Sequence, residues 1–157
     1  MKDYLKFKGN KYVIHLASWY PAKNHEFTAT FVRDQVHSLS EISKSVLITI
    51  IEEKKLTKVY HEENDYLHLK EIKVYIPLKG AFLRWIYYFY FYWKYIKMIL
   101  TQFGKPEFVH VHVAYKASGL AFLLFVYYKI PYIITEHFSV FNSNSTQKNK
   151  PFIIWYS

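Results

Sequence analysis

Segments that favour β-strands alternate along this chain with segments of helical periodicity. Residues 12–17 and 46–51 are short apolar stretches, and residues 108–113 and 132–135 repeat the pattern further on. Between them, apolar residues recur at helical spacing, most clearly over 117–128. This alternation predicts an α/β fold, a Rossmann-like parallel sheet with right-handed crossovers and helices on both faces.

The size of the chain fits one domain. With 157 residues, of which 52% are hydrophobic, it can bury one core but not the cores of two ordinary domains. We therefore treat residues 1–157 as a single domain. The mixed, charged segment 54–75 is expected to hold short strands.

The charge balance favours an anionic partner. Lys and Arg number 21 against 12 Asp and Glu, a formal net charge of +9. Nucleic acid, an acidic membrane or a phosphorylated small molecule would all fit, but no nucleic-acid-binding motif is present and we expect no nucleic acid partner. The chain has no cysteine, and its first residues lack the pattern of a secretory leader, so we expect a cytoplasmic location.

Residues 82–100 are almost wholly apolar or aromatic and are about as long as a membrane-spanning helix. Three cations, Arg84, Lys94 and Lys97, interrupt the segment, and two of them lie well inside it. Since a bilayer core disfavours such charges, we expect a surface or core helix in a soluble or peripheral protein.

The faces of this aromatic helix differ in chemistry. One face is expected to lie in the core, and a second arc mixes cations with rings, as at a membrane interface. Coverage of that arc by a neighbouring element is the equal alternative. The predicted core face holds Trp85, Tyr88, Phe89, Tyr92, Ile96 and Ile99, and the predicted membrane-contact arc holds Arg84, Tyr87, Tyr90, Phe91, Lys94 and Lys97.

Polar and aromatic residues follow three of the predicted strands. Parallel sheets bind ligands outside the carboxyl ends of their strands, near the point where strand order reverses. We expect these residues to gather around one site. They are Ser18, Trp19 and Tyr20 after the first strand, His112 at the end of a later one, and Glu136 and His137 after the last.

The histidines have more than one interpretation. His110 and His112 share a strand face, and His110 is expected to be a core histidine bonded within the protein. For His112 and His137 a functional role and a core role stay open. A zinc site on the two strand histidines, completed by His137 or Glu136, is a weaker alternative. The chain has no Gly-x-Gly-x-x-Gly and no phosphate-binding loop, which argues against dinucleotide or P-loop binding.

Two groups of motifs resemble the family 4 glycosyltransferases. His15 to Pro21, followed by Ala29 to Gln35, is similar to the family's Ser/Thr-x-Tyr-Pro turn and Gly-x-Phe-Val-x-x-Gln helix start. Glu107 to His112 and Lys129 to His137, with Gly119-Leu120-Ala121 between them, resemble its His-x-His strand, the following helix and its Ile-Pro-x-x-x-Thr-Glu-His strand. The motifs occur in the family's order and cover most of the chain.

The resemblance implies the N-terminal, acceptor-side half of a GT-B fold, in which two Rossmann-like domains face each other across a cleft. It implies that His112 is catalytic and that Glu136 and His137 line the cleft nearby. The loop at Ala29 and Thr30 would approach the donor phosphates at a helix N-terminus. The family usually has glycine where this chain has Ala29, and the added Cβ puts that phosphate contact in question.

The implied function is transfer of a sugar from a UDP- or GDP-linked donor to a lipid-linked or polysaccharide acceptor. Family members of this hexosyltransferase type retain the anomeric configuration and need no metal or other cofactor. The alternative is a non-catalytic module, derived from such a domain, that binds a membrane or a partner chain. An anionic surface on the inner face of the plasma membrane is the expected membrane partner.

The family's second, nucleotide-sugar-binding domain has no counterpart in these 157 residues. We therefore expect the chain to be an incomplete GT-B N-terminal domain that is inactive by itself, with the C-terminal domain as its missing partner.

Overall fold

A seven-stranded sheet organises the chain, with strand order β3-β4-β2-β1-β5-β6-β7. The computed structural model describes residues 11–23, 27–77, 80–136 and 152–156. Five strands run parallel, and the two edge strands, β3 and β7, are antiparallel to their neighbours. The strands are β1 (Tyr12–Ala17), β2 (Lys44–Glu53), β3 (Tyr60–Asp65), β4 (Leu69–Pro77), β5 (Phe108–His112), β6 (Tyr132–Glu136) and β7 (Phe152–Tyr156).

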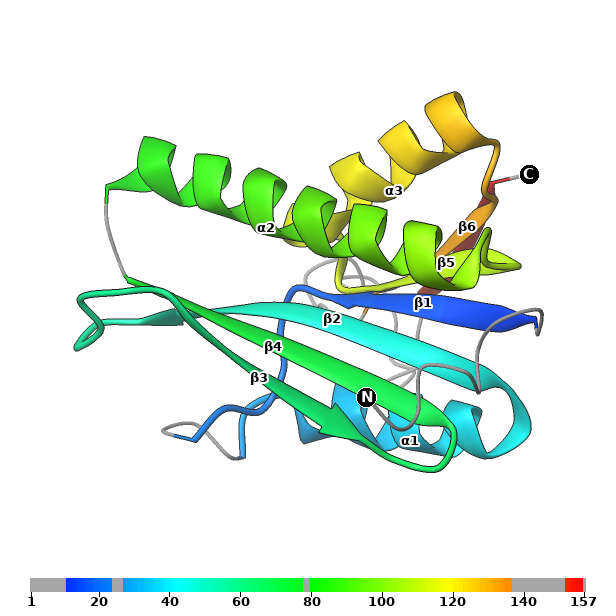
Figure 1. The fold of residues 1–157 in the computed structure, drawn as a ribbon, viewed down its shortest axis with the longest axis horizontal. Coiled ribbons are helices and arrows are strands. Elements are labelled where there is room, and N and C mark those ends of the chain that lie inside the picture. The colour runs from blue at the N-terminus through cyan, green and yellow to red at the C-terminus, as the bar shows by residue number, and fades with distance from the viewer. Residues whose placement is uncertain (1–10, 24–26, 78–79, 137–151, 157) are drawn as a thin grey trace, which may run out of the picture.

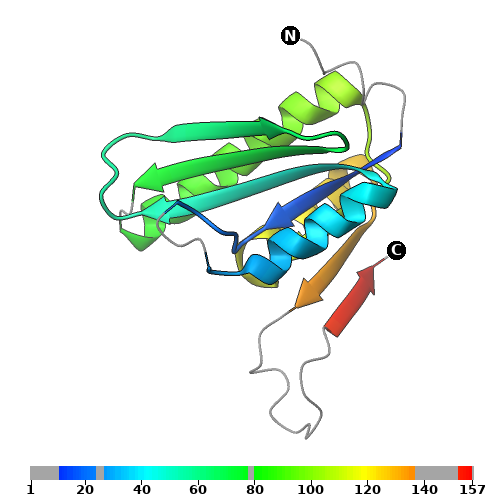
Figure 2. The same cartoon turned by 90° about the horizontal axis from the view of Figure 1, so that it is seen from below.

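Helices cover both faces of the sheet. Helix α1 (Thr30–Ile42) lies on one face, and α2 (Ala81–Phe103) and α3 (Ala114–Tyr128) lie on the other (Figure 1). In Figure 2 the orange β6 and red β7 arrows run in opposite directions. The chain leaves β1 toward β2 on one side and reaches β5 on the other, so strand order reverses at β1. The predicted Rossmann-like α/β fold is confirmed.

The central strand β1 is buried on both faces, and its side chains alternate between two cores. Tyr12, Ile14 and Leu16 pack into the larger core, under α2 and α3. Ala17 packs into the smaller core with Val32 of α1. The sheet is thus fixed by the apolar side chains that the sequence pattern singled out.

Helix α2 is rotated about its axis relative to the sequence prediction. Tyr88, Tyr92, Ile96 and Ile99 are buried as expected, but Trp85 and Phe89 of the predicted core face are 43% and 41% exposed. Their rings lie along α3 instead of under the helix: the ring centroids of Trp85 and Tyr115 are 6.2 Å apart. The prediction failed there because a helical wheel does not show that a second helix packs alongside.

The predicted membrane-contact arc is corrected at two positions for the same reason. Phe91 is only 8% exposed and packs in the larger core with Tyr95. Arg84 pairs with Glu52 of β2, so it faces the end of the sheet. Tyr87 is half-buried, whereas Tyr90, Lys94 and Lys97 are exposed. Among the described helices, none is both long and apolar enough to cross a membrane.

The residues just before α1 and just before α3 adopt a backbone conformation that ordinary residues avoid. Ala29, just before α1, has φ 54°, and Val113, just before α3, has φ 66°. Positive φ strains a residue with a Cβ, and a β-branched residue most of all. At Ala29 the chain therefore uses a conformation that glycine adopts without strain.

Ala29→Gly should change stability little, because opposing effects of similar size meet there. The variant gains about 1–2 kcal/mol because glycine adopts the left-handed conformation without strain. It loses a similar amount because one methyl group is no longer buried and because glycine gives the unfolded chain more conformational entropy. Ala117→Gly, in the buried interior of α3, has no strain to relieve and should cost about 2 kcal/mol. Urea unfolding of both variants measures the difference, and equal losses would contradict the strain argument.

Candidate functional site

A pocket of about 400 Å³ opens where β1 and β2 end, beside the first turn of α3. This is the carboxyl edge of the sheet, next to the point where strand order reverses, which is where parallel sheets bind ligands. Three predicted site residues line it, together with residues of β2, α2 and α3. The lining comprises Ser18, Trp19, Tyr20, Ala22, Thr28, Ile50, Ile51, Glu52, Tyr88 and Lys116.

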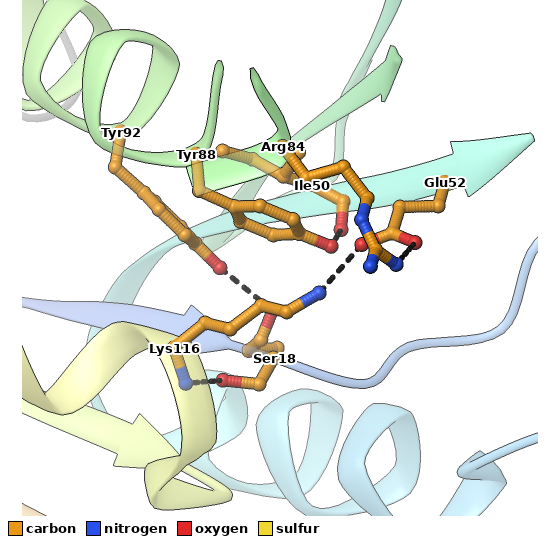
Figure 3. A network of polar contacts seen from close by, with 8 residues as sticks. Ser18, Ile50, Glu52, Arg84, Tyr88, Tyr92 and Lys116 are labelled. Atoms are coloured by element: carbon orange, nitrogen blue, oxygen red, sulfur yellow. Dashed lines mark hydrogen bonds and ion pairs between the residues drawn. The ribbon is translucent and has the colours of Figure 1, made fainter. Parts of the chain in front are cut away.

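An ion network centres on Glu52 at the pocket wall (Figure 3). Its Oε1 lies 2.6 Å from Lys116 Nζ, and its Oε2 lies 3.2 Å from Arg84 Nη1. Lys116 Nζ also lies 3.9 Å from the centre of the Tyr88 ring, a cation–π contact. Burial by itself raises the pKa of Glu52, but the bonds and charges of the two cations outweigh it and lower that pKa. One carboxylate thus holds two cations, leaving the network net positive.

Ser18 joins the end of β1 to the first turn of α3. Its hydroxyl donates to the Val113 carbonyl at 2.8 Å and accepts from the Lys116 backbone N–H at 3.2 Å. Its own backbone N–H donates to the His112 carbonyl at 3.1 Å. The Ser18 hydroxyl thus accepts from one of the free N–H groups in the first turn of α3, which has no local side-chain cap, and this contact helps to set the position of Lys116.

Glu136 also serves α3. Its Oε2 accepts a hydrogen bond of 3.0 Å from the Ala114 N–H, at the positive end of the helix dipole. Glu136 is not among the pocket-lining residues. The expectation that it lines the site therefore fits less well than a role in holding α3, whose first turn carries Lys116.

Tyr20 extends the pocket wall toward β4. Its hydroxyl donates to Glu71 Oε1, and Glu71 also accepts from Asn64 and pairs with Lys73. Burial raises the pKa of Glu71, but these hydrogen bonds outweigh it and the pKa is lowered. Trp19 is 37% exposed at the pocket, so its ring is accessible to a ligand. Tyr20 is thus held by Glu71, and Trp19 lines the pocket with part of its surface exposed.

His112 lies behind the pocket and is completely buried. Its Nε2 is 3.0 Å from His15 Nδ1, and His15 Nε2 is 3.2 Å from Ser45 Oγ. Ser45 donates its proton to the Ser43 carbonyl, so its oxygen accepts from His15 Nε2–H. The His15 Nδ1 therefore accepts from His112 Nε2–H. The expectation that the His112 side chain belongs to the site is corrected: it does not line the pocket, and its imidazole links β5 to β1.

His110 was expected in the core, and the structure places it there. It is 4% exposed, and its Nε2 lies 2.8 Å from Thr135 Oγ1. Together with His15 and His112 it forms a group of metal-ligand type whose ligand atoms lie within 4.8 Å of one another. Tetrahedral zinc holds imidazole nitrogens about 3.3 Å apart, so an ion between His15 and His112 must replace their hydrogen bond. Hydrogen bonds engage both ring nitrogens of His15 and the Nε2 atoms of His110 and His112.

The remaining predicted site residues divide among other places. Ala29 is 9% exposed and Thr30 begins α1, while their neighbour Thr28 lines the pocket. His137 lies outside the described residues. Sequence reasoning missed Glu52 and Lys116, which are single charged residues at the end of a strand and in the first turn of a helix. The site rule, applied to the end of residues 46–51 as well, could have found Glu52.

Comparisons with known proteins do not add to this geometry. Neither the family models, nor the curated proteins, nor the solved structures with which the chain was compared match it. The interpretation of the site therefore rests on its residues and their arrangement.

The buried His15 should make stability depend on pH. Burial, reinforced by the charge of His110, lowers the pKa of His15 from 6.5 to about 3. Below 6.5 the unfolded chain takes up a proton that folded His15 refuses, so stability falls as pH falls from 6.5 toward 3. The loss approaches roughly 1 kcal/mol per pH unit for this one group.

Urea unfolding across this pH range measures the slope. His15→Gln, whose amide does not titrate, should flatten it, and His68→Gln on the surface is the matched histidine control. A slope that persists unchanged in His15→Gln would show that other groups produce it.

Proposed function

We propose that this chain is the acceptor-binding half of a retaining glycosyltransferase that uses a nucleotide sugar. One observation carries the proposal: the pocket at the switch point of the parallel sheet combines an accessible Trp19 with the Glu52–Lys116–Arg84 network. The order of the resembling motifs supports the same function. The donor nucleotide would be held by a second domain facing this edge of the sheet.

The pocket offers the two kinds of contact that a sugar needs. The Trp19 ring presents an apolar face against which the C–H groups of a sugar ring can pack. Glu52 can accept hydrogen bonds from sugar hydroxyl groups, and Lys116 can donate to them. Because Arg84 also pairs with Glu52, the network is net positive, which suits a phosphate of a phosphorylated or lipid-diphosphate-linked acceptor.

Catalysis in this proposal comes from positioning and charge. As the donor diphosphate leaves, negative charge builds up on its leaving oxygen, and cations held rigid in advance can stabilise that charge. Lys116 is held by Glu52, and its backbone is held by Ser18. His112, a positioning residue in this proposal, bonds the Ser18 N–H through its carbonyl oxygen.

The second candidate function is a non-catalytic module that docks on a membrane or a partner. Exposed apolar residues on α2 and α3 favour it. Sugar binding at the pocket separates the two, since the module needs none.

Trp19→Ala should weaken sugar binding at least tenfold, because it removes the accessible ring of the pocket. The measurement is saturation-transfer NMR with free and 1-phosphorylated hexoses and N-acetylhexosamines. Lys116→Met should weaken the binding of phosphorylated sugars more than the binding of free sugars, because it removes a positive charge. Tyr66→Ala and Lys54→Met are matched surface controls outside the pocket. Absence of binding to every sugar, or equal losses in the controls, would contradict the acceptor-site assignment.

Residues 1–157 by themselves should transfer no sugar, because in this proposal a second domain holds the donor. The assay offers UDP- and GDP-hexoses with the same sugars as acceptors, and product is followed by mass spectrometry. Turnover above the rate of a buffer control would show that these residues hold both substrates.

A further inference from the structure

Large apolar side chains are exposed along the outer side of α2 and α3. Tyr115 and Phe122 are 63% and 53% exposed, and Phe82 is 78% exposed. The two helices share one side of the sheet, opposite α1 (Figure 1). We call this surface the α2–α3 outer face. Its members are Phe82, Ile86, Phe89 and Tyr90 of α2, and Tyr115, Phe122, Val126 and Tyr127 of α3.

The two helices form one continuous surface. The rings of Trp85 and Tyr115 lie 6.2 Å apart near the start of α3, and those of Trp93 and Tyr128 lie 6.2 Å apart near its end. Between these pairs, α3 approaches α2 closely: a Cβ at Gly119 would lie 3.8 Å from Phe89 Cζ. Single exposed apolar residues are common on protein surfaces, whereas a continuous apolar surface across two helices is typical of a binding site for a protein or a membrane.

The charge of this surface has one sign. No Asp or Glu occurs in α2 or α3. Lys94 and Lys97 are exposed on α2, and Lys129 follows α3 directly. All three ammonium groups lie beside rings: Lys94 Nζ is 5.7 Å from the centre of Tyr95, Lys97 Nζ is 5.9 Å from that of Trp93, and Lys129 Nζ is 5.9 Å from that of Phe125. Cations among half-exposed rings match an interface where rings lie at headgroup level and cations meet lipid phosphates.

The same charge pattern argues against a second copy of the chain as the occupant. Two such faces would bring lysines toward lysines, and neither helix offers a carboxylate to pair with them. A bilayer with anionic headgroups supplies the missing negative charge and also takes up the exposed rings. We propose that the α2–α3 outer face docks on an anionic membrane surface, with both helices lying along it.

This surface adjoins the pocket. Tyr115 belongs to the outer face, and the next residue, Lys116, lines the pocket. If the pocket binds a sugar acceptor, which rests on the proposed function, a lipid-linked acceptor can reach it from the docked membrane. Docking itself needs no sugar, so a failure of either proposal leaves the other testable.

Vesicle sedimentation of the full chain tests the docking. The chain should sediment with phosphatidylcholine–phosphatidylglycerol vesicles, weakly or not at all with phosphatidylcholine alone, and less at high salt. The Lys94→Glu, Lys97→Glu double variant should bind the mixed vesicles at least about tenfold more weakly. Lys54→Glu with Lys55→Glu, on the exposed turn after β2, is the matched charge control and should bind as the parent does.

A second pair of variants tests the apolar contribution. Phe82→Ser with Phe122→Ser should also weaken binding at least about tenfold, since two exposed rings are lost. Ile42→Ser with Leu67→Ser is the matched control, because both side chains are exposed, at 84% and 70%, away from α2 and α3. Circular dichroism checks that every variant keeps its fold.

Three results would overturn the proposal. One is no sedimentation with the mixed vesicles, and another is equal weakening by the control variants. The third is a concentration-dependent dimer, seen by analytical ultracentrifugation without vesicles, that both outer-face variants abolish. That result would assign the face to self-association.

Discussion

The burial of β1 on both faces is the constraint from which much of the structure follows. All six of its residues are buried, so the polar side chain of His15 needs partners inside the protein. Ser45 of β2 and His112 of β5 supply them, one from each neighbouring strand. Where the strand ends, Ser18 meets the same need by bonding the first turn of α3. Hydrogen bonds at the end of β1 therefore also position α3, the helix whose first turn carries Lys116 into the pocket.

The fold could be predicted from the sequence because its signal is local. Apolar stretches such as 12–17 and 46–51 reflect burial on both faces, and the structure places strands on both, extending the second to Lys44–Glu53. The site could be predicted only in part. Ser18 to Tyr20 were found by their place after a strand, but Glu52 acts through Lys116, 64 residues away in the chain. A local sequence pattern does not show whether a charged residue such as Glu52 has an ion-pair partner, because that partner lies far away in the sequence.

His112 shows the same limit from the other direction. Its place at the end of β5 predicted a side chain at the site, since strand ends meet at that edge. Its orientation is set by a hydrogen bond to His15, and the neutral state of that partner, whose pKa is near 3, makes the bond possible. The strained backbone at Val113, immediately after His112, could not be predicted from the sequence either, because valine rarely adopts a positive φ.

The cations of α2 and α3 fall into two groups, those that pair with a carboxylate and those that do not face one. Arg84 and Lys116 turn toward Glu52, the acidic residue at the end of β2, whereas Lys94 and Lys97 face outward from helices that contain no acid. An ion pair at the half-buried pocket is screened less than one in water and holds its groups in place. Outward lysines keep their charge available to an external anion. The positive charges of the two helices are thus used differently: Arg84 and Lys116 pair with Glu52 at the edge of the sheet, whereas under the docking proposal Lys94 and Lys97 would attract an anionic surface.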